Sequence, residues 1–128
     1  MDVIHSAIWV SDVEETLEFY VGELGLEKTN DFVGGDDARN VYVRGESETE
    51  IQFKHKPDHD LGEPSTRRFD HLALEVDDTD ALVERLTGET DSKLLRGPLD
   101  STGVNGRIAF VTDPDGHVIE LIEPREDL

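Results

Sequence analysis

Apolar and polar residues alternate along the chain with two different periods, and these periods predict its secondary structure. Residues 4–10 and 69–76 alternate with a period of two, which predicts β-strands because successive side chains of a strand point to opposite faces. Each strand is followed by apolar residues at helical spacing. The helical stripes are Val13, Leu17, Tyr20, Val21 and Leu24 in the first case, and Leu82, Val83 and Leu86 in the second. The first stripe ends at Gly25, a residue favoured just after a helix, and the second, shorter stripe precedes Gly88.

The start of each predicted helix carries a capping signal. Ser11 and Glu14 have the spacing of a capping box, in which a hydroxyl and a carboxylate satisfy free backbone N–H groups. Asp77 occupies the corresponding N-cap position of the second helix. Both helices are therefore expected to begin directly after a strand.

Three short strands are expected after each helix. They lie near residues 27–33, 40–44 and 50–55 in the first half, and near 93–96, 107–112 and 118–122 in the second. The run from Asp113 to Gly116 reads Asp-Pro-Asp-Gly, which favours a tight turn and joins the last two strands as a hairpin. The element order is thus β-α-β-β-β, twice.

The two halves also match residue by residue. When the second half is aligned on the first, His5 falls on His71, Val10 on Val76, Asp12 on Asp78, Glu18 on Glu84 and Gly22 on Gly88, all with the same offset. Such self-similarity is typical of a duplicated structural unit. With 128 residues, the chain has the size of one domain. We expect one α+β domain, 1–128, with module one at 1–56, a connecting loop at 57–68 and module two at 69–128.

Charge is the most unusual feature of the composition. The chain has 12 Lys and Arg against 31 Asp and Glu, a formal net charge of −19. A strongly negative surface repels phosphate backbones, so nucleic acid is excluded as a partner. The carboxylates are spread from end to end instead of forming a tail, a pattern similar to that of proteins from salt-accumulating halophiles. At about 1 M salt the screening length is only about 3 Å, which weakens such self-repulsion.

The composition also limits location and chemistry. The chain lacks an apolar run long enough to cross a membrane and a basic, apolar signal segment, so we expect no membrane association and a cytoplasmic location. It has no cysteine, which excludes disulfides, thiolate ligands and cysteine nucleophiles. Any metal ion must be held by His, Asp, Glu or amide oxygen.

The strand pattern places four such donors at matching positions. His5 shares a face with Ala7 and Trp9, and His71 occupies the same position in the second half. Gln52 and Glu120 each lie in the last strand of their half, opposite apolar neighbours. Two imidazoles and two oxygen donors suit a divalent ion such as Zn, Ni, Co, Mn or Fe(II). Glu50 shares the face of Gln52 and is the alternative oxygen donor.

The sequence resembles the vicinal oxygen chelate superfamily, which comprises the glyoxalases, bleomycin-resistance proteins and ring-cleaving dioxygenases. The resemblance covers nearly the whole chain. Its motifs are Ile4-His5-x-Ala7-Ile8-x-Val10-x-Asp12, Phe19-Tyr20, Leu24-Gly25-Leu26, Asp70-His71-Leu72-Ala73-Leu74-x-Val76-Asp77-Asp78 and Ala109-Phe110-x-x-Asp113-Pro114-Asp115-Gly116-x-x-Ile119-Glu120-Leu121. The last stretch is most similar to glyoxalase I (lactoylglutathione lyase).

The resemblance implies a fold, a metal site and a reaction. The fold is a pair of βαβββ modules forming a cupped, barrel-like sheet around one divalent metal ion. The implied metal ligands are His5, Gln52, His71 and Glu120. Because the glyoxalase I site usually forms between two subunits, a homodimer is implied. The reaction converts a 2-oxoaldehyde–thiol hemithioacetal to a 2-hydroxyacyl thioester through a metal-bound enediolate, with Glu120 as general base and then general acid.

Three positions bear on the substrate. Gln52 resembles the ligand set of methylmalonyl-CoA epimerase, since bacterial glyoxalase I commonly has Glu there. Trp9 stands where a glutathione-binding Arg is often found, and Arg67 matches an Arg that binds the substrate carboxylate in some glyoxalases. We therefore expect Trp9 and Arg67 to contact a small-molecule substrate carried by a thiol or by CoA.

Three other functions remain open. One is an epimerase acting on an acyl-CoA. Another is an Fe(II) ring-cleaving dioxygenase with His5, His71 and Glu120 as its facial triad. The last is a metal-free small-molecule-binding protein of the bleomycin-resistance type.

Overall fold

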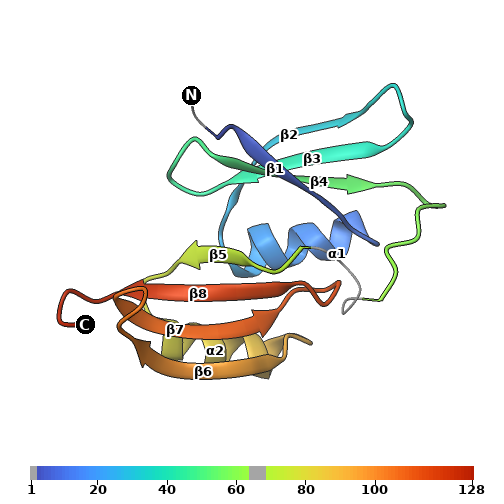
Figure 1. Ribbon diagram of the computed structural model, residues 1–128. Coiled ribbons are helices and arrows are strands. Elements are labelled where there is room, and N and C mark those ends of the chain that lie inside the picture. The colour runs from blue at the N-terminus through green and yellow to red at the C-terminus, as the bar shows by residue number, and fades with distance from the viewer. Residues whose placement is uncertain (1–2, 64–68) are drawn as a thin grey trace. The chain divides into compact units, whose positions relative to one another are not determined.

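The computed structural model describes residues 3–63 and 69–128 of the chain. The chain divides between residues 65 and 66 into two compact units. Each unit consists of a four-stranded sheet and one helical segment (Figure 1). The predicted α+β fold, with two βαβββ modules, is confirmed. Among the described helices, none is long and apolar enough to cross a membrane.

The first unit follows the predicted order of elements. Its elements are β1 (His5–Trp9), α1 (Val13–Leu17), a π-helical segment η1 (Glu18–Glu23), β2 (Glu27–Val33), β3 (Arg39–Arg44) and β4 (Glu50–His55). The strands lie in the order β1-β4-β3-β2. Strand β1 runs parallel to β4, and the other pairs are antiparallel.

The second unit repeats this topology. Its elements are β5 (Leu72–Glu75), α2 (Thr79–Glu89), β6 (Leu94–Ser101), β7 (Gly106–Thr112) and β8 (Val118–Pro124). The strands lie in the order β5-β8-β7-β6, with β5 parallel to β8. The parallel pair places the first and last strands of each unit side by side, as Figure 1 shows for β5 and β8.

The predicted capping residues are wrong by one position in both helices. The N-cap of α1 is Asp12, whose carboxylate accepts a hydrogen bond from the Glu15 N–H at 3.1 Å. The N-cap of α2 is Asp78, which accepts from the Ala81 N–H at 3.0 Å. Both aspartates have the extended backbone that an N-cap requires. The match between the two halves is preserved, because both helices start one residue later than expected.

A buried core lies between each sheet and its helix. In the first unit Tyr20 packs on Phe53 with ring centroids 4.7 Å apart, and both side chains are fully buried. In the second unit the core contains Leu86 of α2 with Ile119 and Leu121 of β8, all fully buried. These apolar residues alternate along their strands with the candidate ligands. The core therefore fixes which face of each sheet carries His5 and Gln52, or His71 and Glu120.

Strand β6 is longer than expected. It continues to Ser101, well past the end predicted near residue 96, and it pairs with β7 through two register shifts. Gly97 has φ of +85°, and a Cβ there would lie 2.7 Å from the carbonyl oxygen of Ile108. The close approach of the two backbones requires glycine at this position. Because the glycine interrupts the alternation of side chains, the sequence pattern ended too early.

Candidate metal centre

The register of the two parallel strand pairs is the same in both units. Ala7 of β1 lies opposite Gln52 of β4, and Ala73 of β5 lies opposite Glu120 of β8. Each candidate histidine stands two residues before its alanine, and the strand period directs both toward the face of the oxygen donor. His5 is the first residue of β1, and His71 directly precedes β5. Each unit therefore supplies one imidazole and one oxygen donor.

In the second unit the predicted pair is in direct contact. The Nε2 atom of His71 lies 3.2 Å from Oε1 of Glu120. The Nδ1 atom of the same ring lies 2.6 Å from a carboxylate oxygen of Asp70. The side chain of Glu120 is only 10% exposed, whereas that of His71 is 35% exposed. Asp70 was not among the residues predicted from the sequence.

This contact has the chemistry of a metal or proton site. A neutral His71 whose Nδ1–H donates to Asp70 presents a lone pair at Nε2. A lone pair facing a carboxylate oxygen is repulsive unless a proton or a metal ion lies between the two atoms. Two donors that each lie about 2.1 Å from one ion are separated by roughly 3.0–3.4 Å in octahedral or tetrahedral geometry. The observed separation of 3.2 Å falls in this range, so the pair fits a divalent ion.

In the first unit an aromatic ring and an amide surround the corresponding residues. His5 contacts Tyr42 edge-on, with ring centroids 5.4 Å apart. Gln52 is buried and donates a hydrogen bond from Nε2 to Oδ1 of Asn40 at 2.8 Å. The alternative donor Glu50 accepts a hydrogen bond from the Thr29 hydroxyl. Gln52 is thus the more buried of the two oxygen donors.

The same aromatic contact recurs in the second unit. His71 meets Phe110 edge-on, with ring centroids 6.0 Å apart. Tyr42 is the cross-strand partner of Gln52, and Phe110 is the cross-strand partner of Glu120. Sequence reasoning missed both aromatic residues. Their separation along the chain equals that between Gln52 and Glu120, so extending the comparison of the halves to these positions would have found them.

Of the two predicted substrate contacts, Trp9 lies within the described residues, at the end of β1. Trp9 stacks on His59 with ring centroids 3.8 Å apart, and the Lys54 ammonium lies 5.2 Å from the Trp9 ring centre. Lys54 also lies 3.5 Å from a carboxylate oxygen of Asp36. Arg67 lies outside the described residues. Lys54 is therefore the cation that the structure places beside Trp9.

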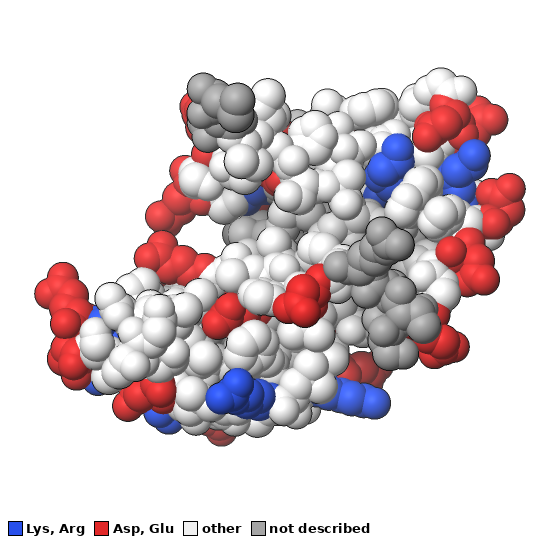
Figure 2. Space-filling model, viewed as in Figure 1, with Lys and Arg blue, Asp and Glu red and all other residues white. Residues whose placement is uncertain are grey.

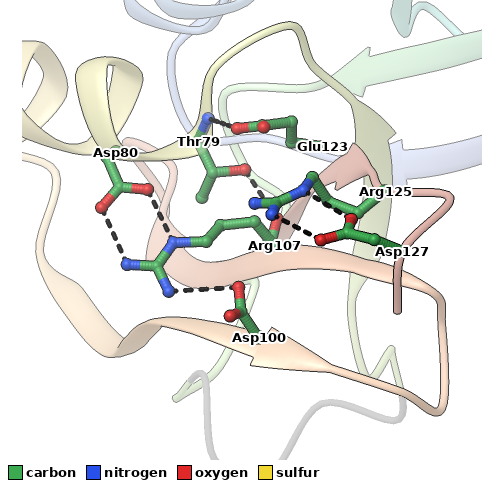
Figure 3. Close-up of polar contacts among 7 residues, drawn as sticks. All are labelled: Thr79, Asp80, Asp100, Arg107, Glu123, Arg125 and Asp127. Atoms are coloured by element: carbon green, nitrogen blue, oxygen red, sulfur yellow. Dashed lines mark hydrogen bonds and ion pairs between the residues drawn. The ribbon is translucent and has the colours of Figure 1, made fainter.

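A second group of carboxylates, formed by Asp78, Asp80 and Glu123, has donor atoms within 4.8 Å of one another. Asp78 caps α2, and Glu123 accepts a hydrogen bond from the Thr79 N–H at 3.0 Å. Asp80 binds the Arg107 guanidinium through two hydrogen bonds of 2.8 and 3.0 Å (Figure 3). This arrangement joins the start of α2 to β7 and β8, and its carboxylates have structural partners.

Arg107 changes the acid–base properties of this group. The hydrogen bonds from its guanidinium hold the pKa of the Asp80 carboxyl below its ordinary value of 3.8. Arg107 also lies 3.3 Å from an oxygen of Asp100 on β6, as Figure 3 shows. These contacts link three elements of the second unit.

Comparison with known proteins agrees with the fold. Residues 3–121 match the model of the Glyoxalase/Bleomycin resistance protein/Dioxygenase superfamily. A probable lactoylglutathione lyase from Synechocystis sp. is 32% identical over 96% of this chain and 95% of its own length. A glyoxalase I mutant from Zea mays has a TM-score of 0.81 at 24% identity, covering 97% of this chain and 45% of that one. TnmS3, an antibiotic binding protein from Streptomyces sp., has a TM-score of 0.73 at 29% identity, and the match covers 97% of this chain and 96% of TnmS3. The chain belongs to the glyoxalase/bleomycin resistance protein/dioxygenase superfamily.

Proposed function

We propose that the protein is a metal-dependent, glyoxalase I-like lyase. It would convert the hemithioacetal of a 2-oxoaldehyde and a thiol to a 2-hydroxyacyl thioester. Curated relatives such as the Synechocystis protein are named lactoylglutathione lyase, which supports this activity. The observation that carries the proposal is the 3.2 Å approach of His71 Nε2 to the buried Glu120 carboxylate.

The proposed ligands are His5, Gln52, His71 and Glu120, one imidazole and one oxygen donor from each unit. Support comes from the equal register of the two strand pairs and from membership of the family. A bound divalent ion would act as a Lewis acid, drawing electron density from the two adjacent oxygens of the substrate. The proton transfer is carried out by the protein's side chains.

Glu120 is the proposed proton carrier. Its carboxylate removes the proton from the carbon that bears the hydroxyl and the sulfur, and returns it to the neighbouring carbonyl carbon. The hydroxyl proton moves between the two oxygens, so the reaction is an isomerisation that needs no oxidant. Near-complete burial of the Glu120 side chain excludes water that would otherwise exchange with the transferred proton.

Gln52 favours a second candidate, an epimerase acting on an acyl-CoA. An amide ligand adds no charge, so it leaves the site more positive than a glutamate would. That charge favours an anionic intermediate, which epimerisation next to a thioester also requires. In this reading Lys54, which lies beside Trp9, would contact the phosphates of the carrier.

The experiment follows product formation on purified, metal-loaded protein in high salt. Thioester formation from methylglyoxal is measured with glutathione and other thiols, in parallel with epimerisation of methylmalonyl-CoA. Metal content is measured by elemental analysis, and chelation should abolish the activity. We expect about one metal ion per chain and thioester formation with at least one thiol.

Three results would contradict the proposal. Activity on the CoA ester alone would replace it with the epimerase. Cleavage of an aromatic ring would replace it with the dioxygenase. A folded protein that binds no metal and catalyses neither reaction would favour a binding role like that of the antibiotic binding protein TnmS3.

A further inference from the structure

Two amide side chains are buried together in the first unit. Asn40 on β3 is 4% exposed and Gln52 on β4 is 9% exposed. Asn40 stands two residues before Tyr42, the cross-strand partner of Gln52. The two amides therefore meet diagonally on the face that also carries His5.

A backbone carbonyl fixes the orientation of both amides. The Ala38 carbonyl can only accept a hydrogen bond, so the Asn40 atom 2.9 Å away must be the Nδ2 donor. Oδ1 of Asn40 then faces Gln52 and can only accept, so the Gln52 atom 2.8 Å away must be Nε2. The hydrogen-bonding partners alone thus fix which atom of each amide is the nitrogen.

The orientation leaves the Gln52 oxygen available. Its nitrogen is engaged by Asn40, and within residues 3–63 and 69–128 Oε1 has no hydrogen-bond partner. An amide binds a metal ion through oxygen, since its nitrogen has no available lone pair. The hydrogen bond to Asn40 thus occupies Nε2 of Gln52 and leaves Oε1, the atom that can bind a metal ion, available.

The second unit lacks this arrangement. Tyr42 corresponds to Phe110, so Asn40 corresponds to Ile108. An isoleucine cannot bind a carboxylate, and the polar neighbour of Glu120 is His71. The duplicated strands therefore carry an amide partner only where the oxygen donor is itself an amide.

We infer that Asn40 is a positioning residue that holds Gln52 as a neutral, fixed oxygen ligand. The inference rests on the proposed function, in which Gln52 binds the metal. A glutamate at position 52 would bring a carboxylate against Oδ1 of Asn40. The two oxygen atoms would repel each other unless the Asn40 amide rotated, and that rotation would break its hydrogen bond to the Ala38 carbonyl. Asn40 therefore favours glutamine over glutamate at position 52. With glutamine there, Glu120 is the only carboxylate among the proposed ligands.

The test measures binding of Co²⁺ alone to the full-length, metal-free chain by calorimetry. Asn40→Leu should raise the Kd about tenfold, the lower end of the effect of removing a partner that orients a ligand. Because Asn40 acts through Gln52, Asn40→Leu should have no further effect in a Gln52→Ala background. Asn30→Leu, at an exposed position of β2, is the matched control and should bind like the wild type. If Asn40→Leu does not fold, Asn40→Ala provides the same comparison.

A second readout does not need the metal. In the wild type, the NMR signals of the Gln52 side-chain amide should exchange slowly with water, and in Asn40→Leu they should exchange rapidly. Rapid exchange in the wild type would overturn the inference whatever the Kd values. Equal increases of the Kd in both backgrounds would also overturn it, since Asn40 would then act through folding.

Failure of the proposed function gives a different result. If the wild type binds no Co²⁺, or if Gln52→Ala leaves the Kd unchanged, Gln52 is not a ligand. Asn40 then does not position a metal ligand, even if the Gln52 side-chain amide exchanges slowly. Slow exchange, a higher Kd in Asn40→Leu and loss of that effect in Gln52→Ala together support the inference.

Discussion

At the scale of single residues, the carboxylate of Asp70 bears most directly on the proposed ligand His71. It lies 2.6 Å from Nδ1 of the ring and should hold the tautomer whose Nε2 can bind a metal ion. Asp70→Asn should raise the Kd for Co²⁺ by up to about tenfold, a modest effect because the Asp70 side chain is 94% exposed. Calorimetry checks the value, with Asp91→Asn, a substitution in an exposed bend, as control. Equal Kd values for Asp70→Asn and the wild type would exclude this role.

The strand period predicted which side chains share a face but not which of them touch. Alternation alone placed His71 and Glu120 on one face, and the structure shows them 3.2 Å apart. Asn40 could not be found in this way, because its contact with Gln52 runs diagonally between strands and depends on their register. Arg67 lies outside the described residues, so its role stays a prediction.

At the scale of elements, the sequence predicted the order and type of the strands and helices better than their ends. The hairpin at Asp113–Gly116 is confirmed, with the Gly116 N–H donating to the Asp113 carbonyl at 3.0 Å. The single long stripe expected for the first helix became α1 followed by η1, and in η1 the buried residues are Phe19 and Tyr20. Helix starts shifted by one residue, since Ser11 and Asp12 are both good N-caps.

The N-caps can be tested directly. Asp78→Ala removes the carboxylate that accepts from Ala81 and should lower the free energy of unfolding by about 1 kcal/mol. The matched control is Asp77→Ala, which removes the neighbouring carboxylate without removing the cap and should cost much less. Urea unfolding measures both variants. A larger loss for Asp77→Ala would restore the original prediction.

The ion pair between α2 and β7 predicts a pH dependence. Arg107 lowers the pKa of Asp80 below 3.8, so the folded state favours the ionised carboxylate. This contribution to stability is complete above the unfolded pKa and is lost as the pH falls through the folded pKa. Wild type should therefore unfold at a higher urea concentration than Asp80→Asn at pH 7, and the difference should shrink below about pH 4. A difference independent of pH would show that Arg107 and Asp80 are not coupled.

At the scale of the whole molecule, charge is a property of the surface and says little about the site. Figure 2 shows carboxylates in several separate groups over the visible face, with few basic side chains between them. Carboxylates exceed cations by 19 over the whole sequence, yet the proposed chemistry uses one of them, Glu120. Composition led only to expectations about partners, whereas the internal repeat and the strand period predicted the fold and the candidate site.

The surface charge predicts a strong dependence on salt. Repulsion among the carboxylates should destabilise the protein at low ionic strength and be screened at molar KCl. The Tm should therefore rise as KCl increases from about 0.05 to about 2 M. A variant with exposed Glu46, Glu48 and Glu126 changed to Gln should show a smaller rise. A Tm that is constant or falls with KCl would contradict the halophilic interpretation.

The proposed function depends above all on Glu120, which moves the proton in a metal-dependent isomerisation. The most direct test is the rate of thioester formation by metal-loaded Glu120→Gln, with metal content measured on the same sample and Glu84→Gln on the exposed face of α2 as control. We predict a loss of about 10²–10⁴-fold in kcat, with one metal ion retained per chain and full activity in the control. Wild-type turnover by metal-loaded Glu120→Gln would contradict it.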